Sequence, residues 1–244
     1  MPPLFGSLNH AYRGASSDFM GPDPSFISTS ANNGEREHFI SSITTNVTSF
    51  FREKHHFDLL TEKILADSND VKRSLNIWSA GCSSGQEPYS IAMCLLQALP
   101  DLAARTQILA TDIDVAILRK AEVGIYTRKE LMALPPAFLG RSFFSSIRNA
   151  QSDEMQLQHK IRNMVKFQNL NLNSSWAMPV QFDIIFCRNV AIYFSQTTQE
   201  RLWRRFVTAL RPGGWLLIGH AERIPPELHS ILRPNGMTAY QKIS

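Results

Sequence analysis

The sequence predicts an α/β protein whose main domain is a doubly wound, mostly parallel sheet covered by helices. Two observations favour this class. After a polar break at residues 67–74, runs of apolar and β-branched residues alternate with amphipathic helical patterns, as in successive βαβ units. A glycine-containing turn joins the first of these runs to a helical pattern. The chain has 244 residues, 43% of them hydrophobic, which is enough for one such domain and a small appendage.

Six strands and three helices make up the predicted alternation. The stretch 143–169 interrupts it, because its apolar residues stand among polar ones, as in short, half-exposed antiparallel strands. We therefore expect a small inserted β-subdomain there, within a main domain that spans residues 67–244. The strands are expected at residues 76–80, 107–111, 165–167, 182–187, 215–219 and 238–242, and the helices at residues 87–99, 115–122 and 196–210.

The part of the chain before this domain is expected to be short and partly helical. Residues 1–33 are rich in turn-forming residues and lack a sustained apolar period, which predicts a mobile arm. In residues 34–66, apolar side chains recur at intervals of three and four. This spacing predicts one helix over residues 35–43 and a second that follows Thr48 and reaches Ile64.

Composition argues against several classes of protein. The net charge is +4, but the basic residues are scattered without an aromatic-basic stripe, so we expect no nucleic-acid partner. No apolar run approaches the roughly 18 residues of a membrane span, and the N-terminus lacks a secretory pattern, so we expect a cytoplasmic protein that is not embedded in a membrane. Cys82, Cys94 and Cys187 are widely spaced, which indicates neither a disulfide framework nor a metal site.

The first motif with chemical content is the glycine turn of residues 78–90, WSAGCSSGQEPYS. Gly81 and Gly85 allow positive φ angles and a close approach of a ligand to the backbone. Glu87 stands in the first turn of the following helix, where a dinucleotide would place its phosphate. A carboxylate there repels phosphate and suits a positively charged ligand such as S-adenosylmethionine. The alternative is that Glu87 only complements the helix dipole.

Two further motifs follow predicted strands. Asp112 ends the second strand, at about the distance where dinucleotide-binding folds place a ribose-binding acid, although it could also be a helix cap. Asp114 is the better candidate for the N-cap of the next helix. The buried strand 182–187 delivers polar residues at its carboxyl end, and Arg188, Asn189 and Tyr193 are candidates to line a pocket there.

Together with the upstream segment 44–53, TTNVTSFFRE, these motifs closely resemble the chemotaxis receptor methyltransferases of the CheR family. The resemblance runs from about Phe39 to the C-terminus. It implies a class I methyltransferase (Rossmann-like) core with a small β-subdomain. It also implies methyl transfer from S-adenosylmethionine to glutamate side chains on the cytoplasmic signalling domain of chemotaxis receptors, with S-adenosylhomocysteine as product.

The resemblance also implies a set of site residues. Arg52 and Tyr193 match positions near the methyl-transfer centre, and we expect catalytic roles for both. Residues matching the cofactor site are Asn46, Thr48, Arg52, Gly81, Glu87, Asp112, Asn171, Leu172, Arg188 and Asn189. His55 and His56 are interpreted as structural, because no metal-ligand spacing surrounds them.

Two departures from the family leave alternatives open. Fewer than fifty residues precede Asn46, whereas members usually carry a longer helical N-terminal domain that helps to recognise the receptor. The chain could therefore be a methyltransferase for another protein substrate, or a non-catalytic signalling module that binds S-adenosylmethionine. The second departure is Val47, where many members have Glu. A methyltransferase for amines or nucleobases is less favoured, because the sequence after residue 187 is RNVA rather than Asn/Asp-Pro-Pro-Tyr.

Overall fold

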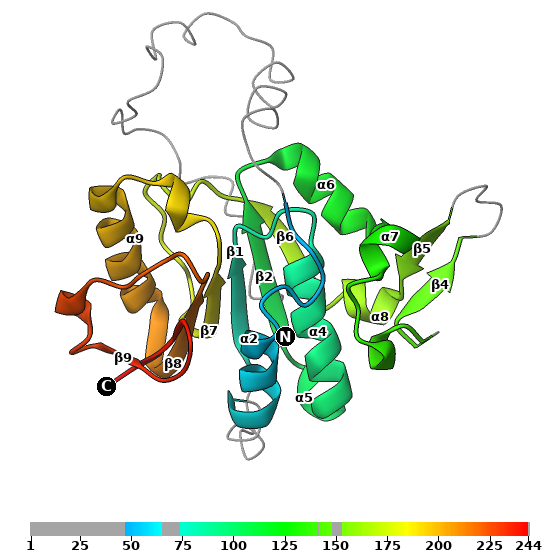
Figure 1. Ribbon diagram of the computed structural model, residues 1–244, viewed down its shortest axis with the longest axis horizontal. Helices are drawn as coiled ribbons and strands as arrows, with labels where there is room; N and C mark the ends of the chain where they lie inside the picture. The colour runs from blue at the N-terminus through cyan, green and yellow to red at the C-terminus, as the bar shows by residue number, and fades with distance from the viewer. Residues whose placement is uncertain (1–46, 65–73, 141, 148–152, 244) are drawn as a thin grey trace, which may run out of the picture.

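The computed structural model describes residues 47–64, 74–140, 142–147 and 153–243 (Figure 1). A seven-stranded sheet lies at the centre, and its order β6-β2-β1-β7-β8-β10-β9 places later strands on both sides of β1. The pairs that join β6, β2, β1, β7 and β8 are parallel, whereas β10 runs antiparallel to β8 and β9. The predicted doubly wound α/β class is confirmed. The strands are β1 (Asn76–Ala80), β2 (Gln107–Asp112), β6 (Val165–Asn169), β7 (Phe182–Cys187), β8 (Leu210–Ile218), β9 (Leu232–Pro234) and β10 (Ala239–Lys242).

Helices cover both faces of this sheet because successive strand residues point to opposite sides. In β7, Ile184 and Phe186 join the core on the face that also holds α4, whereas Ile185 and Cys187 join the core beneath α9. No helix among the described residues is both long and apolar enough to span a bilayer. The helices are α4 (Gln86–Ala98), α5 (Pro100–Ala103), α6 (Val115–Val123), α7 (Arg128–Leu131), α8 (His159–Arg162) and α9 (Gln196–Ala209), with short 3-10 turns η3 (Pro136–Phe138), η4 (Ala191–Tyr193) and η5 (Pro226–Leu228).

A second, three-stranded antiparallel sheet projects from the side of the large one, as Figure 1 shows at the right. Its order is β3-β5-β4, formed by Ile125–Thr127, Glu154–Leu157 and Phe144–Ser146. The expected β-subdomain is therefore present. Its first strand precedes the expected range, and β6 at the end of that range pairs with β2 in the large sheet. Strand β3 has only three residues, too few for a recognisable apolar alternation.

The N-terminal helical segment begins later than expected. Helix α2 (His55–Leu59) continues into a π-helical turn, η2 (Leu60–Ile64), whereas the residues just before it form a turn. The prediction of a helix directly after Thr48 is wrong there. Phe51 and Glu53 have φ angles of 53° and 55°, which an α-helix does not allow. The other expected helix, over residues 35–43, and the arm of residues 1–33 lie outside the described residues.

Candidate functional site

The carboxyl ends of β2, β1 and β7 lie next to one another at one edge of the large sheet (Figure 1). The glycine turn follows Ala80 at the end of β1, Asp112 ends β2, and Arg188 follows Cys187 at the end of β7. Because neighbouring parallel strands end at the same edge, the sheet brings the three motifs together. Ligands of open α/β sheets bind at such an edge.

The glycine turn has the backbone conformation that its sequence suggests. Gly81 and Gly85 have φ angles of 85° and 92°, and Gly85 is the N-cap of α4. The backbone N–H of Gly81 donates to the carbonyl oxygen of Thr111 at 2.7 Å. A Cβ at position 81 would lie 2.3 Å from Cγ2 of Val190. The absence of a side chain at Gly81 therefore allows the loop after β7 to pack closely against the glycine turn.

Asp112 uses both carboxylate oxygens to hold the surrounding backbone. Oδ2 accepts the backbone N–H of Ser83 at 2.8 Å, and Oδ1 accepts that of Asp114 at 3.0 Å. Burial raises the pKa of Asp112, although these two N–H groups partly oppose the rise. Each oxygen keeps a second lone pair for a ligand. Asp114 caps α6 as expected, since its carboxylate accepts the N–H groups of Ala116 and Ile117.

Arg188 lies buried between two carboxylates that come from different elements. Its Nη1 is 3.3 Å from Oε2 of Glu87, in the first turn of α4, and its Nε is 3.8 Å from Oε2 of Glu53, in the N-terminal loop. Its guanidinium also lies over the ring of Phe57, 5.7 Å from the centroid. Glu87 accepts a further hydrogen bond from the hydroxyl of Ser79 at 2.6 Å. The residue expected to suit a positive ligand therefore already has a cationic partner.

The two carboxylates beside Arg188 have opposite pKa shifts. The pKa of Glu87 is raised, mainly by burial, and the charges of Glu53 and Glu222 add to the rise. The charge of Arg188 and the hydrogen bond from the Ser79 hydroxyl act in the opposite direction but are outweighed. Burial also acts to raise the pKa of Glu53, but the hydrogen bond from His220 and the charge of Arg188 outweigh burial and lower this pKa. The site thus concentrates carboxylates around one guanidinium.

Glu222, which the sequence analysis did not single out, joins the ends of β7 and β8. Its buried carboxylate accepts four backbone N–H groups, from Asn189 at 3.1 Å, Val190 at 2.9 Å, Ala191 at 2.7 Å and Gly219 at 2.6 Å. Asn189 is held in the left-handed region, with a φ angle of 59°. The sequence gives only a weak signal for this role. Glu222 stands three positions after Gly219, which follows a buried strand.

Arg52 lies in the turn before α2, not on a helix as the sequence analysis expected. Its Nη1 donates to the carbonyl oxygen of Val47 at 2.8 Å, and its own carbonyl oxygen accepts a hydrogen bond from Nη2 of Arg188. The neighbouring N–H of Phe51 donates to the hydroxyl of Ser90 in α4 at 3.0 Å. These contacts fold the N-terminal loop onto α4 and the end of β7.

The remaining candidate residues are less closely connected to this cluster. Asn46 lies outside the described residues, and Thr48 is half-buried at the start of the N-terminal loop. Asn171 follows β6, which borders β2, and its side-chain oxygen accepts a backbone N–H two residues on. Leu172 is buried beside it. Tyr193 ends η4 with 61% of its surface exposed, which makes its ring available to a partner molecule.

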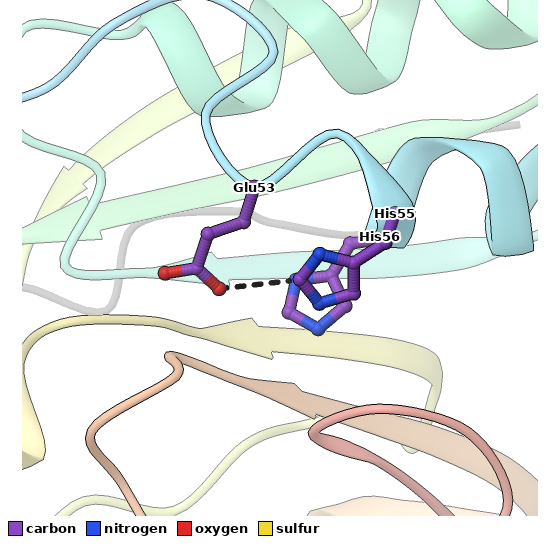
Figure 2. Close-up of side chains that lie close together, drawn as sticks. All are labelled: Glu53, His55 and His56. Carbon is purple, nitrogen blue, oxygen red and sulfur yellow. Dashed lines mark ion pairs between the residues drawn. The ribbon is translucent and has the colours of Figure 1, made fainter.

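The rings of His55 and His56 lie next to each other at the start of α2, with centroids 4.1 Å apart and planes tilted by 48° (Figure 2). The Nε2 atoms of both rings lie within hydrogen-bond distance of Oγ1 of Thr238, at 3.3 Å and 2.9 Å. Burial and the charge of Arg188 lower the pKa of His56 to about 3, so its ring is neutral near pH 7. Together with Glu53, the two rings offer three atoms within 4.8 Å of one another.

Comparisons with known proteins identify the family. Residues 46–240 match the family model described as the CheR methyltransferase, SAM binding domain. A probable chemotaxis protein methyltransferase of Rhizobium etli is 39% identical over 88% of this chain and 81% of its own length. The chemotaxis protein methyltransferase of Escherichia coli is 41% identical over 88% of this chain and 73% of its own.

A search of solved structures found methyltransferases of distant sequence. Magnesium protoporphyrin IX methyltransferase from Synechocystis, solved with bound SAM, has a TM-score of 0.45 and 15% identity over 79% of this chain and 80% of its own. A protein named PKMT2 from Rickettsia typhi, in complex with AdoHcy, has a TM-score of 0.37 and covers 59% of this chain and 20% of its own. The assignment of the family depends on the sequence matches.

The residues at the sheet edge fit the cofactor of this family. S-adenosylmethionine carries a sulfonium, an ammonium group and two ribose hydroxyls, all of which carboxylates bind well. Asp112 supplies a carboxylate at the end of β2, Glu87 supplies one in the first turn of α4, and Arg188 offers a guanidinium that suits a carboxylate. The chain therefore belongs to the CheR methyltransferase family and is an S-adenosylmethionine-dependent methyltransferase.

Proposed function

We propose that this protein methyl-esterifies glutamate side chains on the cytoplasmic signalling domain of chemotaxis receptors, and that it acts in the cytoplasm. The observation that carries the proposal is the match of residues 46–240 to the CheR family, together with the names of the relatives as chemotaxis protein methyltransferases. The methyl group would come from S-adenosylmethionine, with S-adenosylhomocysteine as product. We further propose that residues 1–33 form an arm and that residues 34–66 form a short N-terminal segment, with helix α2 at His55–Leu59, before the catalytic domain of residues 67–244.

The proposed cofactor site uses the groups at the sheet edge. Asp112 would accept hydrogen bonds from the ribose hydroxyls, because its carboxylate lies at the end of β2. Glu87 would accept hydrogen bonds from the amino group, because its carboxylate lies in the first turn of α4. Arg188 would hold the cofactor's carboxylate. The other residues proposed to bind the cofactor are Asn46, Thr48, Arg52, Gly81, Asn171, Leu172 and Asn189.

The proposed reaction needs no general base. A glutamate carboxylate has an ordinary pKa of about 4.3 and is ionised near neutral pH, so it is ready to attack without losing a proton. The bound cofactor supplies an electrophilic methyl group. The protein would mainly hold the two reactants in line, and such positioning contributes roughly 7 to 11 kcal/mol in favourable cases. Arg52 and the exposed ring of Tyr193 are proposed to guide the incoming carboxylate.

Incubation of the purified chain with methyl-labelled S-adenosylmethionine and receptor cytoplasmic fragments tests this proposal. We expect base-labile label on the receptor fragment, because methyl esters hydrolyse in alkali. A matched fragment whose methyl-accepting Glu residues are replaced by Gln should take up no label. Base-stable label would indicate another acceptor group. No label on the receptor fragment, but label on other proteins when a cell extract is added, would indicate another substrate, and cofactor binding without any transfer would indicate a non-catalytic module. Each of these three results would contradict the proposal.

A further inference from the structure

Glu53 ends the upstream sequence motif and has no role in the function described above. Its backbone is in the left-handed region, with a φ angle of 55°, which a non-glycine residue adopts at an energetic cost. This conformation accompanies an inward carboxylate, since only 11% of the side chain is exposed. The turn therefore places a carboxylate inside the protein, where its contacts decide what it does.

The carboxylate of Glu53 contacts residues after two distant strands and a histidine of its own segment. Its Oε1 lies 3.1 Å from Nδ1 of His220, after β8. Its Oε2 lies 3.8 Å from Nε of Arg188, after β7, and 3.7 Å from Nδ1 of His56, in α2. Figure 2 shows Glu53 pointing toward the histidine rings from the loop before α2. Glu53 therefore connects the N-terminal segment to the ends of two strands of the site.

Three polar atoms in this cluster are buried and have no hydrogen-bond partner among the described residues. They are Oε2 of Glu53, Nε of Arg188 and Nδ1 of His56. Thr238 donates its hydroxyl to the carbonyl oxygen of Met237 at 2.8 Å, so it accepts from Nε2 of His56 and leaves Nδ1 of that ring as an acceptor. One donor and two acceptors therefore lie close together without a direct hydrogen bond, and Glu53 contacts Arg188 as an ion pair at 3.8 Å.

A metal ion is not suited to this cluster. Glu53, His55 and His56 do offer atoms within 4.8 Å of one another. However, the guanidinium of Arg188 lies 3.8 Å from the same carboxylate oxygen and would repel a cation there. The ring nitrogens that face Thr238 are already within hydrogen-bond distance of its hydroxyl.

We propose that Glu53 is a positioning residue that holds the guanidinium of Arg188 at the sheet edge, away from full pairing with Glu87. Nη1 of Arg188 lies 3.3 Å from Glu87, so a guanidinium freed from Glu53 would move toward that carboxylate. Glu87 would then be neutralised by Arg188 and less able to bind the amino group of the cofactor. This inference rests on the proposed cofactor roles of Arg188 and Glu87, and not on the identity of the methylated substrate.

The substitution Glu53→Gln tests the inference by calorimetric titration of S-adenosylmethionine across a range of pH, without receptor. We expect roughly ten-fold weaker binding near pH 7, as for the loss of a charged contact that orients a binding group. In kinetic assays, KM for the cofactor should rise more than kcat falls. Asp58→Asn removes an exposed carboxylate that pairs with Lys54 in the same segment, and it should leave binding unchanged.

The pH dependence of binding separates positioning from a general structural role. Glu87 faces Arg188, the Ser79 hydroxyl, Glu53 and Glu222. Loss of the Glu53 charge removes one repulsion and brings Arg188 closer, and both changes lower the pKa of Glu87. Cofactor binding, which needs ionised Glu87, should therefore persist to lower pH in Glu53→Gln than in the wild type.

A second variant and a metal measurement complete the test. His220→Ala removes the exposed partner of Glu53 and should weaken cofactor binding in the same direction, by about two- to three-fold. Wild-type affinity and an unshifted pH profile in both variants would overturn the inference. So would one equivalent of zinc bound by the wild type after incubation with zinc and lost in Glu53→Gln. Normal cofactor binding by the wild type with failed methyl transfer to receptor would instead count against the proposed substrate.

Discussion

Two parts of the site are held together by different kinds of contact. The glycine turn is closed by backbone hydrogen bonds that extend the β1–β2 ladder, since the N–H groups of Gly81 and Cys82 both donate to Thr111, at 2.7 and 2.9 Å. The N-terminal loop and the ends of β7 and β8 are joined mainly by side chains, such as those of Glu53 and Glu222. The side chain that adds to this closure, Asp112, belongs to β2 and accepts the N–H of Ser83 in the turn. A region joined by buried carboxylates depends on single side chains.

The largest expected effect is that of Glu222→Gln in the side-chain-held part. In the wild type, the backbone N–H groups of Asn189 and Gly219 donate to the same carboxylate oxygen of Glu222. In the variant, the NH2 of the new amide would face backbone N–H groups, and two donors cannot form a hydrogen bond. Leaving buried donors without an acceptor should lower the free energy of unfolding by about 3 kcal/mol or more, measured by urea denaturation. The exposed Glu227→Gln is the control. Equal stability of the two variants would show that Glu222 does not hold these loops together.

Gly81→Ala tests the backbone-closed part at its least tolerant position. A new Cβ would meet Val190 at 2.3 Å with the backbone at a φ angle of 85°, and the crowding should cost about 2 kcal/mol. Adding Val190→Ala should recover the share of the loss that comes from crowding, and leave the share that comes from φ. A single variant as stable as the wild type would show that the two loops are not in close contact.

Asp112→Ala should weaken cofactor binding at least ten-fold, because it removes the proposed acceptor for the ribose hydroxyls. It should also lower stability by about 1 kcal/mol, because the N–H groups of Ser83 and Asp114 lose their acceptor. Calorimetry and denaturation separate the two effects. Unchanged affinity in the folded variant would remove Asp112 from the cofactor site.

The raised pKa values of Asp112 and Glu87 give a signed prediction for pH. A carboxyl group whose pKa is raised by folding stabilises the folded state below its unfolded pKa, and this contribution is lost as pH rises through the folded pKa. In the proposed cofactor site, S-adenosylmethionine binds the ionised forms of both carboxyl groups. Its stabilising effect on the protein should therefore grow with pH through the same range, and thermal shift with and without S-adenosylmethionine measures it. A cofactor-induced shift that stays constant down to the ordinary carboxyl pKa range would contradict this account.

Arg52→Lys should have a smaller effect, a loss of about five-fold in turnover. Lys keeps the charge but lacks the planar fork that reaches a carboxylate and a carbonyl together. Its hydrogen bond to Val47 is exposed, so stability should hardly change. Turnover and cofactor affinity are measured separately, and near-normal turnover would reduce Arg52 to a general surface charge.

The smallest effect is expected for deletion of residues 1–33, which should leave the melting temperature and its rise with cofactor almost unchanged. Loss of cofactor binding on this deletion would contradict the reading of these residues as an arm.

The contrast between the two parts also explains what could be predicted from the sequence. Strands β1 and β7 have the predicted bounds, because a short buried apolar run beside a turn is a local signal. The spacing of the Phe residues in the N-terminal loop resembles a helical period, which led to the wrong prediction of a helix there. In the structure, Phe50 packs edge-on against the ring of Tyr126, with ring centroids 4.9 Å apart. Glu53 meets His220, 167 positions away, and no local pattern reveals such a contact.

Hydrogen–deuterium exchange with and without S-adenosylmethionine tests most directly whether these two parts form one cofactor site. Backbone amides of the glycine turn, of the N-terminal loop at residues 47–54 and of the β7 end at residues 188–191 should all gain protection when the cofactor binds. Amides of the small sheet should not change. Protection confined to the glycine turn, with the loop and the β7 end exchanging as before, would contradict the account.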